Sequence, residues 1–333
     1  MKRVLVVATG GTIASLPDTS GLAPALTGEE LVARVPLIDG LCQIDVTQPM
    51  NIDSTNMRPR HWLRIRDEIV RAYDSYDAFV VLHGTDAMAY TAAALSYLIQ
   101  GSPKPIVLTG SQQPMANPFT DAKLNLYDSL LWAIDDMSRD VSIVFDGKVI
   151  AGTRARKQRT MSFNAFTSIN YPPLAYLRGD RIVRQGGLVP PVRTAAPRLY
   201  DRLDDRVIVL KLTPELRPSI FELLRKDYQA IILETFGIGG IPEYEDGSFR
   251  DAIYDWVGSG RVLVVTTQVP EEGLDLGVYE VGRAYADHPG ILRGDDMTIE
   301  ALLAKTMWAL AASDGPEEVA ERFYRVVNHD RMA

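Results

Sequence analysis

The first buried-strand pattern of the chain runs directly into a glycine turn that carries two hydroxyl side chains. The run Val4–Ala8 is continuously apolar, which is typical of a strand covered on both faces of a parallel sheet. It is followed by the sequence TGGTIA at residues 9–14. Because ligands of such sheets bind beyond the carboxyl ends of the strands, we expect Thr12 to stand at a functional edge. The glycine spacing is neither that of a dinucleotide site nor that of a phosphate-binding P-loop.

The same order of strand, polar turn and helix recurs along the first half of the chain. Further buried strands are predicted over 78–82, which ends in HGTD at 83–86, and over 105–108, which ends in TGS at 109–111. Apolar spacing predicts helices over 28–35, 62–73, 87–99 and 121–137, a hairpin is expected around 146–147, and the turn-rich segment 15–27 is expected to be a loop or mobile lid. These patterns predict an N-terminal α/β domain with a mostly parallel sheet flanked by helices.

The length of 333 residues exceeds the size at which single hydrophobic cores stop growing, so two domains are expected. Residues 185–205 are rich in Pro, Gly and Arg and lack periodicity, as linkers do. We therefore predict an N-terminal α/β catalytic domain at 1–184, a linker at 185–205 and a smaller C-terminal α/β domain at 206–333. In the latter, strands are expected at 207–212, 230–234 and 262–266 and helices at 220–225, 251–257, 298–312 and 316–327.

Composition limits the partners and the compartment. A net charge of -8 argues against a nucleic acid or an anionic membrane as partner. Cys42 is the only cysteine, which excludes an internal disulfide and fits a reducing compartment. There is neither a signal-peptide pattern nor a membrane-spanning apolar run, so a cytoplasmic location is expected. The histidines lack metal-ligand spacing, and no metal site is expected.

Hydroxyl and charged side chains are expected to meet at one edge of the sheet. A threonine hydroxyl is a poor nucleophile that needs a neighbouring base, and Lys157, from the basic run at 154–159, could take its proton. Asp86 could pair with the ammonium of a ligand or hold that lysine, and Ser54 could bind a ligand carboxylate. This set suits amide hydrolysis by acyl transfer, with backbone N–H groups stabilising the oxyanion and no metal or organic cofactor required.

Each of these residues also has a purely structural interpretation. Thr12 could be a helix N-cap and Thr85 a turn residue, whereas their order and combination favour function. His83 is interpreted as a residue that fixes the turn through hydrogen bonds rather than as a general base. Cys42 is interpreted as a small buried hydrophobe.

The motifs together resemble the bacterial-type L-asparaginases. The resemblance is carried by TGGTIA at 9–14, IDSTNM at 52–57, HGTDAMAYTA at 83–92, LTGSQ at 108–112 and TRARK at 153–157. The sequences GIGGIP at 237–242, TTQ at 266–268 and GDDMTIEALLAKTMWAL at 294–310 are similar to the C-terminal domain of the cytoplasmic, type I branch. The resemblance covers nearly the whole chain. It implies hydrolysis of L-asparagine to L-aspartate and ammonia by a homodimer or homotetramer.

The resemblance also implies roles for single residues. Thr12 would be the nucleophile, and Lys157 would accept the proton of Thr85 beside Asp86, which would also bind the substrate ammonium; which threonine attacks first stays open. On the substrate side, Ser54 would bind the α-carboxylate, Asp53 would support the amino-acid end, and the backbone of Ser111 would face the side-chain amide.

One departure from the family concerns the loop after the first turn. Many members carry a tyrosine there, hydrogen-bonded to the nucleophilic threonine, whereas this chain has GLAP at 21–24 and no tyrosine before Tyr73. Either the activating group comes from elsewhere, or turnover is reduced, or the loop excludes water with Leu22.

Other functions remain open at this stage. An asparaginase-like subunit of a tRNA-dependent amidotransferase would carry an extra N-terminal domain, which is not expected because the first strand starts at Val4. A catalytically weak sensor that binds asparagine or aspartate would keep the pocket without turnover. A nicotinamide-binding module lacks its glycine fingerprint here.

Overall fold

The structure of the protein is a computed structural model that describes residues 1–18, 21–186, 196–245, 248–278, 282, 285, 288 and 290–332. The chain divides into two compact units. The first comprises Met1–Asp201 together with Val327–His329, and the second comprises Arg202–Val326 and the chain from Asp330 onward. Each unit is described by itself below.

The first unit is built on an eight-stranded sheet of order β13-β12-β9-β8-β7-β5-β1-β4. The pairs β1–β4, β1–β5, β5–β7 and β7–β8 are parallel, and the hairpin strands β9, β12 and β13 extend the sheet in antiparallel pairing. Its strands are β1 Arg3–Ala8, β4 Gln43–Thr47, β5 Ala78–Leu82, β7 Ile106–Thr109, β8 Val141–Phe145, β9 Lys148–Ala151, β12 Ala175–Arg178 and β13 Arg181–Arg184. The predicted α/β class with a mostly parallel N-terminal sheet is confirmed.

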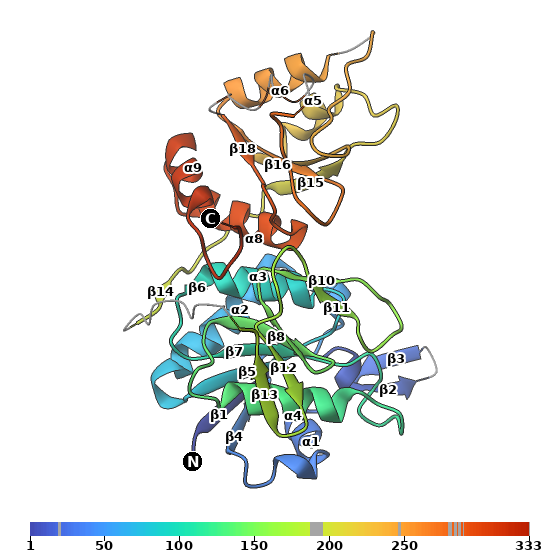
Figure 1. The fold of residues 1–333 in the computed structure, drawn as a ribbon, viewed down its shortest axis with the longest axis vertical. Coiled ribbons are helices and arrows are strands. Elements are labelled where there is room, and N and C mark those ends of the chain that lie inside the picture. Colours follow the sequence, from blue (N-terminus) through green and yellow to red (C-terminus); the bar gives the residue numbers. More distant parts are fainter. Residues whose placement is uncertain are drawn as a thin grey trace. The chain divides into compact units, whose positions relative to one another are not determined.

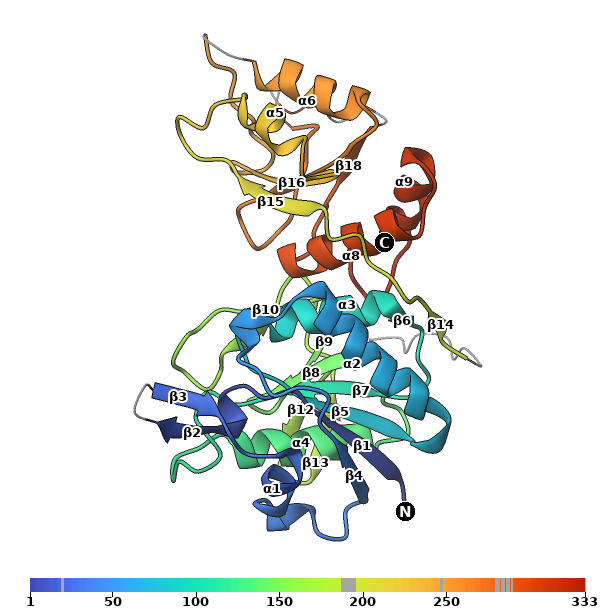
Figure 2. The ribbon, with the colours of Figure 1, turned by 180° about the vertical axis from the view of Figure 1, so that it is seen from behind.

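Helices cover both faces of this sheet, which explains the continuous apolar runs of its central strands. The helices are α1 Gly28–Ala33, α2 Pro59–Ala72, α3 Met88–Leu98 and α4 Ala122–Ala133. Figures 1 and 2 show α1 and α4 on one face and α2 and α3 on the other. On the α1 and α4 side, Val4, Val6 and Val80 form one core with Leu31 and Leu126. Alternate residues of each strand therefore pack against two separate helix layers, one on each face of the sheet.

The strands β12 and β13 were not predicted, and neither were three short pairings outside the main sheet. The segment 15–27, expected as a loop, contains the antiparallel strands β2 Ser15–Asp18 and β3 Gly21–Pro24. Residues 19 and 20 and the Leu22 side chain, for which a water-excluding role was expected, lie outside what the structure describes. The basic run contributes β10 Ala155–Lys157, which pairs with β11 Phe166–Ser168. Strand β6 Ile99–Gln100 pairs with β14 Arg198–Leu199.

The second unit contains a four-stranded parallel sheet. Its strands are β15 Val207–Lys211, β16 Ala230–Thr235, β17 Val262–Thr267 and β18 Ile291–Arg293, and its helices include α5 Ile220–Leu224, α6 Phe249–Gly258, α8 Ile299–Ala311 and α9 Pro316–Tyr324. Trp256, Phe221 and Phe249 pack edge to face in its core. The predicted linker 185–205 includes β14 and residues 187–195, which are not described, so the domain boundary stays a prediction.

The C-terminal segment returns to the first unit at Val327–His329. The side-chain amide of Asn328 donates to Ser96 Oγ at 2.9 Å and to the carbonyl of Val141 at 2.8 Å. The ring of His329 stacks on Tyr171. In the described part of the chain, no helix is long and apolar enough to cross a membrane.

Candidate active site

The turn after β1 is held against the neighbouring strand exit by its glycines. Gly10 and Gly11 have φ angles of +102° and +83°, a backbone region that side chains rarely adopt. Gly11 donates from N to the carbonyl of Ile52 at 3.0 Å. A Cβ atom on Gly11 would stand 2.3 Å from the Cα of Gly84. The two backbones therefore touch, and Thr12 and Thr85 each follow one of the touching residues.

His83 fixes the second of these turns. Its side chain is fully buried, and burial lowers its pKa to about 4, so the imidazole is neutral near pH 7. Nδ1 faces the carbonyl of Gly84 at 2.7 Å and must donate to it. Nε2 then accepts from the hydroxyl of Thr91 at 2.9 Å. Both ring nitrogens are thus engaged, which favours the structural interpretation of His83 over a role as general base.

Lys157 joins the hydroxyl of Thr85 to the carboxylate of Asp86. Its Nζ atom donates to Thr85 Oγ1 at 2.8 Å and to Asp86 Oδ1 at 2.7 Å. Lys157 ends β10, which pairs with β11 and brings the lysine to the exit of β5. Thr85 is buried, whereas the side chain of Asp86 is 59% exposed. An amine beside a buried hydroxyl can take its proton, and the open carboxylate can bind a cationic group.

Thr12 begins the short 3-10 helix η1 Thr12–Ala14. The N-cap of η1 is Gly11, so Thr12 is not the capping residue that the structural interpretation proposed. The following Ile13 and Ala14 are buried, whereas Thr12 is partly exposed. Among the described residues, none forms a hydrogen bond with the Thr12 hydroxyl. Thr12 therefore lies just beyond the exit of β1 with a partly exposed side chain.

Asp53 and Ser54 lie on the segment that pairs with the first turn. Asp53 is the N-cap of the 3-10 helix η3 Ser54–Asn56. Its carboxylate accepts hydrogen bonds from the N and Oγ1 atoms of Thr55. Ser54 is buried, and a Cβ atom on Gly84 would stand 2.6 Å from its Oγ atom. Ser54 therefore packs on the backbone that precedes Thr85, while Asp53 holds the shape of its own turn.

Ser111 and Gln112 follow β7 at the same edge. Ser111 is buried, and its hydroxyl donates its proton to the carbonyl of Gln113 at 2.5 Å. Gln112 was not singled out from the sequence, although LTGSQ contains it. Its Oε1 atom accepts from the Thr85 hydroxyl at 3.4 Å. Its position directly after the TGS turn was the signal that could have identified it.

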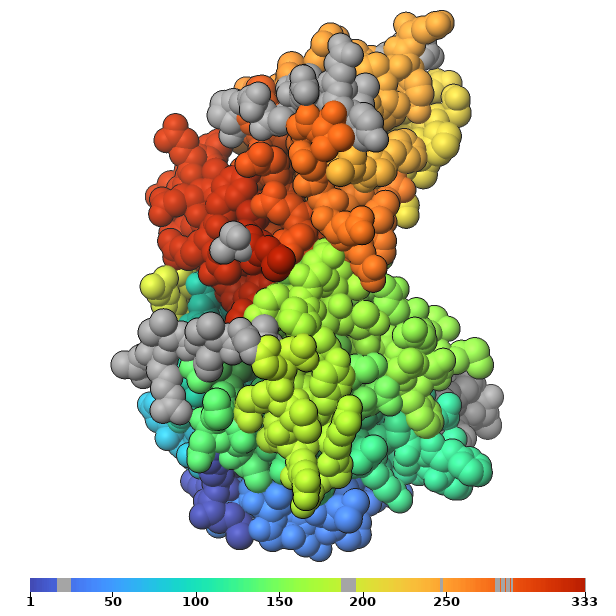
Figure 3. Space-filling model, in the orientation of Figure 1, coloured from blue at the N-terminus to red at the C-terminus, as the bar shows by residue number. Residues whose placement is uncertain are grey.

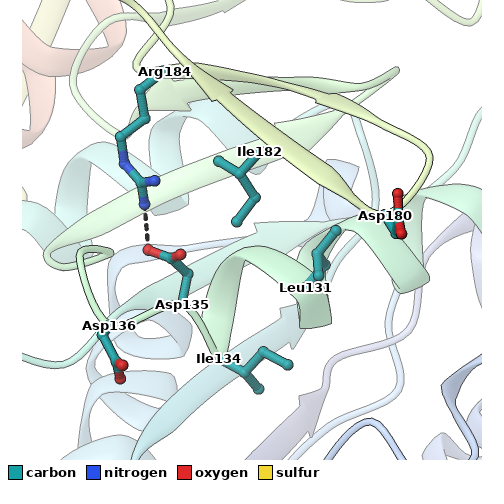
Figure 4. A pocket seen from close by; sticks show the side chains of 7 residues that line it. All are labelled: Leu131, Ile134, Asp135, Asp136, Asp180, Ile182 and Arg184. Atoms are coloured by element: carbon teal, nitrogen blue, oxygen red, sulfur yellow. Dashed lines mark hydrogen bonds and ion pairs between the residues drawn. The ribbon is translucent and has the colours of Figure 1, made fainter.

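A separate surface pocket of the first unit lies away from these residues. Figure 4 shows its acidic and apolar side chains around the ion pair of Arg184 with Asp135. It is lined by Leu131, Ile134, Asp135, Asp136, Asp180, Ile182 and Arg184. Ile182 and Arg184 of this lining belong to β13, and Figure 3 shows the yellow-green stretch of chain that contains β13 at the surface of the first unit. None of the predicted site residues belongs to it. No cluster of three or more metal-ligating side chains occurs in the described ranges.

Fold and site together define a two-unit α/β protein whose hydroxyl, lysine and carboxylate groups meet at the strand exits of the larger sheet. The chain belongs to the asparaginase family: residues 3–187 match the family model for the N-terminal domain of asparaginase, and residues 206–323 match that for the glutaminase/asparaginase C-terminal domain.

Individual relatives agree with this assignment. An L-asparaginase of Thermococcus kodakarensis is 37% identical over 95% of both chains, and the structure of the thermostable L-asparaginase from that organism has a TM-score of 0.91 and covers 99% of both. L-asparaginase 1 of Escherichia coli K12 is 32% identical over 93% of this chain and 92% of its own. The resemblance to the type I branch is thereby confirmed. A glutamyl-tRNA(Gln) amidotransferase component from Metallosphaera sedula is 34% identical over 95% of this chain and 74% of its own length.

Proposed function

We propose that this protein hydrolyses L-asparagine to L-aspartate and ammonia by threonine-dependent acyl transfer. The observation that carries the proposal is the placement of Lys157 between Thr85 and Asp86. Thr85 follows Gly84, whose backbone touches that of Gly11, the residue before Thr12. Membership of the asparaginase family and the names of the relatives support the choice of substrate. The amidotransferase relatives are longer than this chain, and no observation favours that function over hydrolysis.

The substrate is oriented by its two charged groups. The exposed carboxylate of Asp86 takes the α-ammonium, because an ion pair in a partly buried site fixes direction as well as affinity. Ser54 hydrogen-bonds the α-carboxylate, and Asp53 supports this end by keeping the η3 turn in shape. The side-chain amide then points along the strand exits toward Thr12 and the backbone of Ser111.

Hydrolysis proceeds through an ester. The hydroxyl oxygen of a threonine attacks the amide carbon, and its proton passes to an amine or onward to the amide nitrogen. Backbone N–H groups at the glycine-rich turns stabilise the oxyanion. The carbon–nitrogen bond breaks, and ammonia leaves. Water then attacks the ester, its proton returns to the threonine oxygen, and aspartate is released.

The two threonines have different surroundings, which suggests a division of labour. Thr12, without a hydrogen-bond partner in the described structure, is the proposed nucleophile. Thr85, with Lys157 at 2.8 Å, is the group best placed to move a proton to or from the reacting water. The proposed enzyme acts in the cytoplasm as a homodimer or homotetramer.

Ammonia release from L-asparagine by the purified protein tests the proposal. We expect Thr12→Ala and Thr85→Ala each to lower kcat by at least about 100-fold, while Thr213→Ala, which changes an exposed threonine of the second unit, leaves it unaltered. Intact-mass measurement of quenched reactions identifies the attacking residue: an acyl adduct that persists in Thr85→Ala and is absent in Thr12→Ala supports Thr12. Calorimetry that detects tight aspartate or asparagine binding without ammonia release would instead support a sensor.

A further inference from the structure

The carboxylate of Asp121 anchors the turn that carries Gln112. Oδ2 accepts from the backbone N of Gln112 at 2.9 Å, and Oδ1 accepts from the backbone N of Gln113 at 3.0 Å. The side-chain amide of Asn125 donates to Oδ2 at 3.1 Å and also to the carbonyl of Gly110 at 3.0 Å. Asp121 is only 9% exposed. The buried carboxylate therefore holds residues 112 and 113 directly and is linked to Gly110 through Asn125.

All of these partners are N–H donors, which makes the carboxylate hard to replace. Oδ1 also accepts from the backbone N of Gln112, at 3.1 Å. An asparagine at this position would direct its NH2 group at N–H donors from which the carboxylate now accepts, so at least one of these hydrogen bonds would be lost. Asp121 also precedes α4, yet its side chain makes no capping hydrogen bond to that helix. Its carboxylate therefore holds the turn, and the positive end of the helix favours its charge.

The anchored Gln112 bridges two parts of the candidate site. Its Nε2 atom donates to the carbonyl of Ser162 at 3.2 Å and lies 3.5 Å from that of Arg159, both in the loop that joins β10 to β11. Because carbonyls accept only, these contacts assign Nε2 to the loop and Oε1 to Thr85. The loop begins directly after Lys157. Gln112 therefore touches the hydroxyl that Lys157 contacts and also the segment that carries Lys157.

We propose that Asp121 is a positioning residue that sets the geometry of the Thr85–Lys157 pair through Gln112. The carboxylate orients the backbone of Gln112, and the Gln112 amide orients the Thr85 hydroxyl and ties down the β10–β11 loop. This role rests on the proposed function, since it matters for turnover only if Thr85 and Lys157 act on the substrate. Asp121 itself lies behind Gln112 and is not assigned a contact with substrate.

A double-mutant cycle tests the proposed coupling. We expect Asp121→Asn to lower kcat by about 10- to 100-fold with KM changed less than about threefold, because a misaligned hydroxyl slows the reaction more than it weakens binding. Gln112→Ala should lower kcat similarly, and the double variant should be no slower than Gln112→Ala alone. The matched control is Asp128→Asn, which alters a buried carboxylate within α4 that has no described contact to the 110–113 turn. It should keep kcat within about twofold.

Two results would overturn the proposal. One is a kcat for Asp121→Asn equal to that of the natural chain, with the variant folded by circular dichroism. The other is strict additivity of the two losses, which would mean that Asp121 acts independently of Gln112.

Amide hydrogen exchange separates this proposal from the proposed function. In Asp121→Asn, exchange should accelerate in peptides covering 110–113 and also in those covering 158–163, since Gln112 connects the two. Acceleration confined to 110–113 would contradict the coupling. If the natural chain released no ammonia, the proposed function would fall, while the exchange pattern would still decide whether Asp121 controls the β10–β11 loop.

Discussion

The Nζ atom of Lys157 lies 2.8 Å from the Oγ1 atom of Thr85, although 72 residues separate them in the sequence. Thr85 follows the end of β5, a central parallel strand of the sheet, whereas Lys157 is the last residue of a short strand outside that sheet. The contact therefore depends on the hairpin of β10 and β11 folding back over the strand exits. A hydrogen bond between a hydroxyl and an amine is the element of the site that most directly indicates proton transfer.

Replacing Lys157 by methionine tests this element. Lys157→Met keeps the length of the side chain and removes the group that contacts Thr85 and Asp86, so we expect kcat to fall by about 100-fold or more. Lys148→Met provides the control, because Lys148 is also in the first unit and forms only a long, partly exposed ion pair of 3.7 Å with Asp146. Equal initial rates for the two variants would contradict a role for Lys157 in the reaction.

The contact between Gly11 and Gly84 leads to a second prediction. A methyl group on Gly11 would stand 2.3 Å from Gly84 Cα, and the φ angle of +83° disfavours alanine as well. Gly40 has a similar φ of +77° with no atom within 4 Å of such a methyl group. We expect Gly40→Ala to cost about 1 kcal/mol from backbone conformation alone. Gly11→Ala should cost at least about 2 kcal/mol more and abolish turnover, because the two turns must separate.

Urea unfolding and ammonia release measure both glycine effects. The difference between the two variants isolates the steric cost from the conformational cost. An active Gly11→Ala protein as stable as Gly40→Ala would show that the two turns need not touch.

Much of the first unit follows from its local sequence. The runs that became β1, β5, β7 and β8 are buried on both faces, and such strands leave a strong apolar signal. The turns that end them carry glycines and hydroxyls, so Thr12, Thr85 and Ser54 could be proposed as neighbours before the fold was known. Parallel topology alone brings those exits to one edge.

The short antiparallel pairs were less predictable for a physical reason. Strand β10 reads as a basic run, and its pairing with β11 is determined by contacts remote in sequence rather than by alternation. The environment of Gln112 likewise depends on Asp121 and on the β10–β11 loop, none of which is adjacent to it in sequence. Side-chain networks of this kind arise from packing and leave no periodic pattern.

The buried imidazole of His83 makes stability depend on pH. The unfolded chain binds a proton at His83 near pH 6.5, whereas burial lowers the pKa of the folded chain to about 4. The unfolded state therefore binds more protons than the folded state between these pH values. The stability that the neutral, buried His83 contributes is fully present above pH 6.5 and is lost as the pH falls to 4. The size of this loss is about 3 kcal/mol.

Two carboxyls oppose this effect, so a variant is needed to see it. Burial raises the pKa of Asp128 and of Asp140 to about 6, and these groups make the folded state less stable as the pH rises from 3.8 to 6. Acidification from pH 7.0 to pH 4.5 should therefore lower the urea midpoint through His83 and raise it through Asp128 and Asp140. His83→Gln, although less stable at pH 7.0, should lose less stability on acidification than the natural chain. An unchanged difference between the two midpoints would contradict a neutral, buried His83.

The second unit contains a fully buried ion pair whose two charges depend on each other, which a double variant can test. The Nζ atom of Lys305 lies 2.5 Å from Asp330 Oδ2, and both side chains are 0% exposed. Lys305 also donates to the carbonyl of Arg325 at 2.7 Å. Removing one charge leaves the other buried without its counter-ion, so Lys305→Met and Asp330→Leu should each lower the free energy of unfolding by about 3–5 kcal/mol. The double variant should recover most of that loss, because no isolated charge remains and the apolar replacements can pack.

Chemical unfolding of the full chain, followed by tryptophan fluorescence, measures all four proteins. A double variant as unstable as the sum of the single ones would mean that the two side chains contribute independently rather than as a pair.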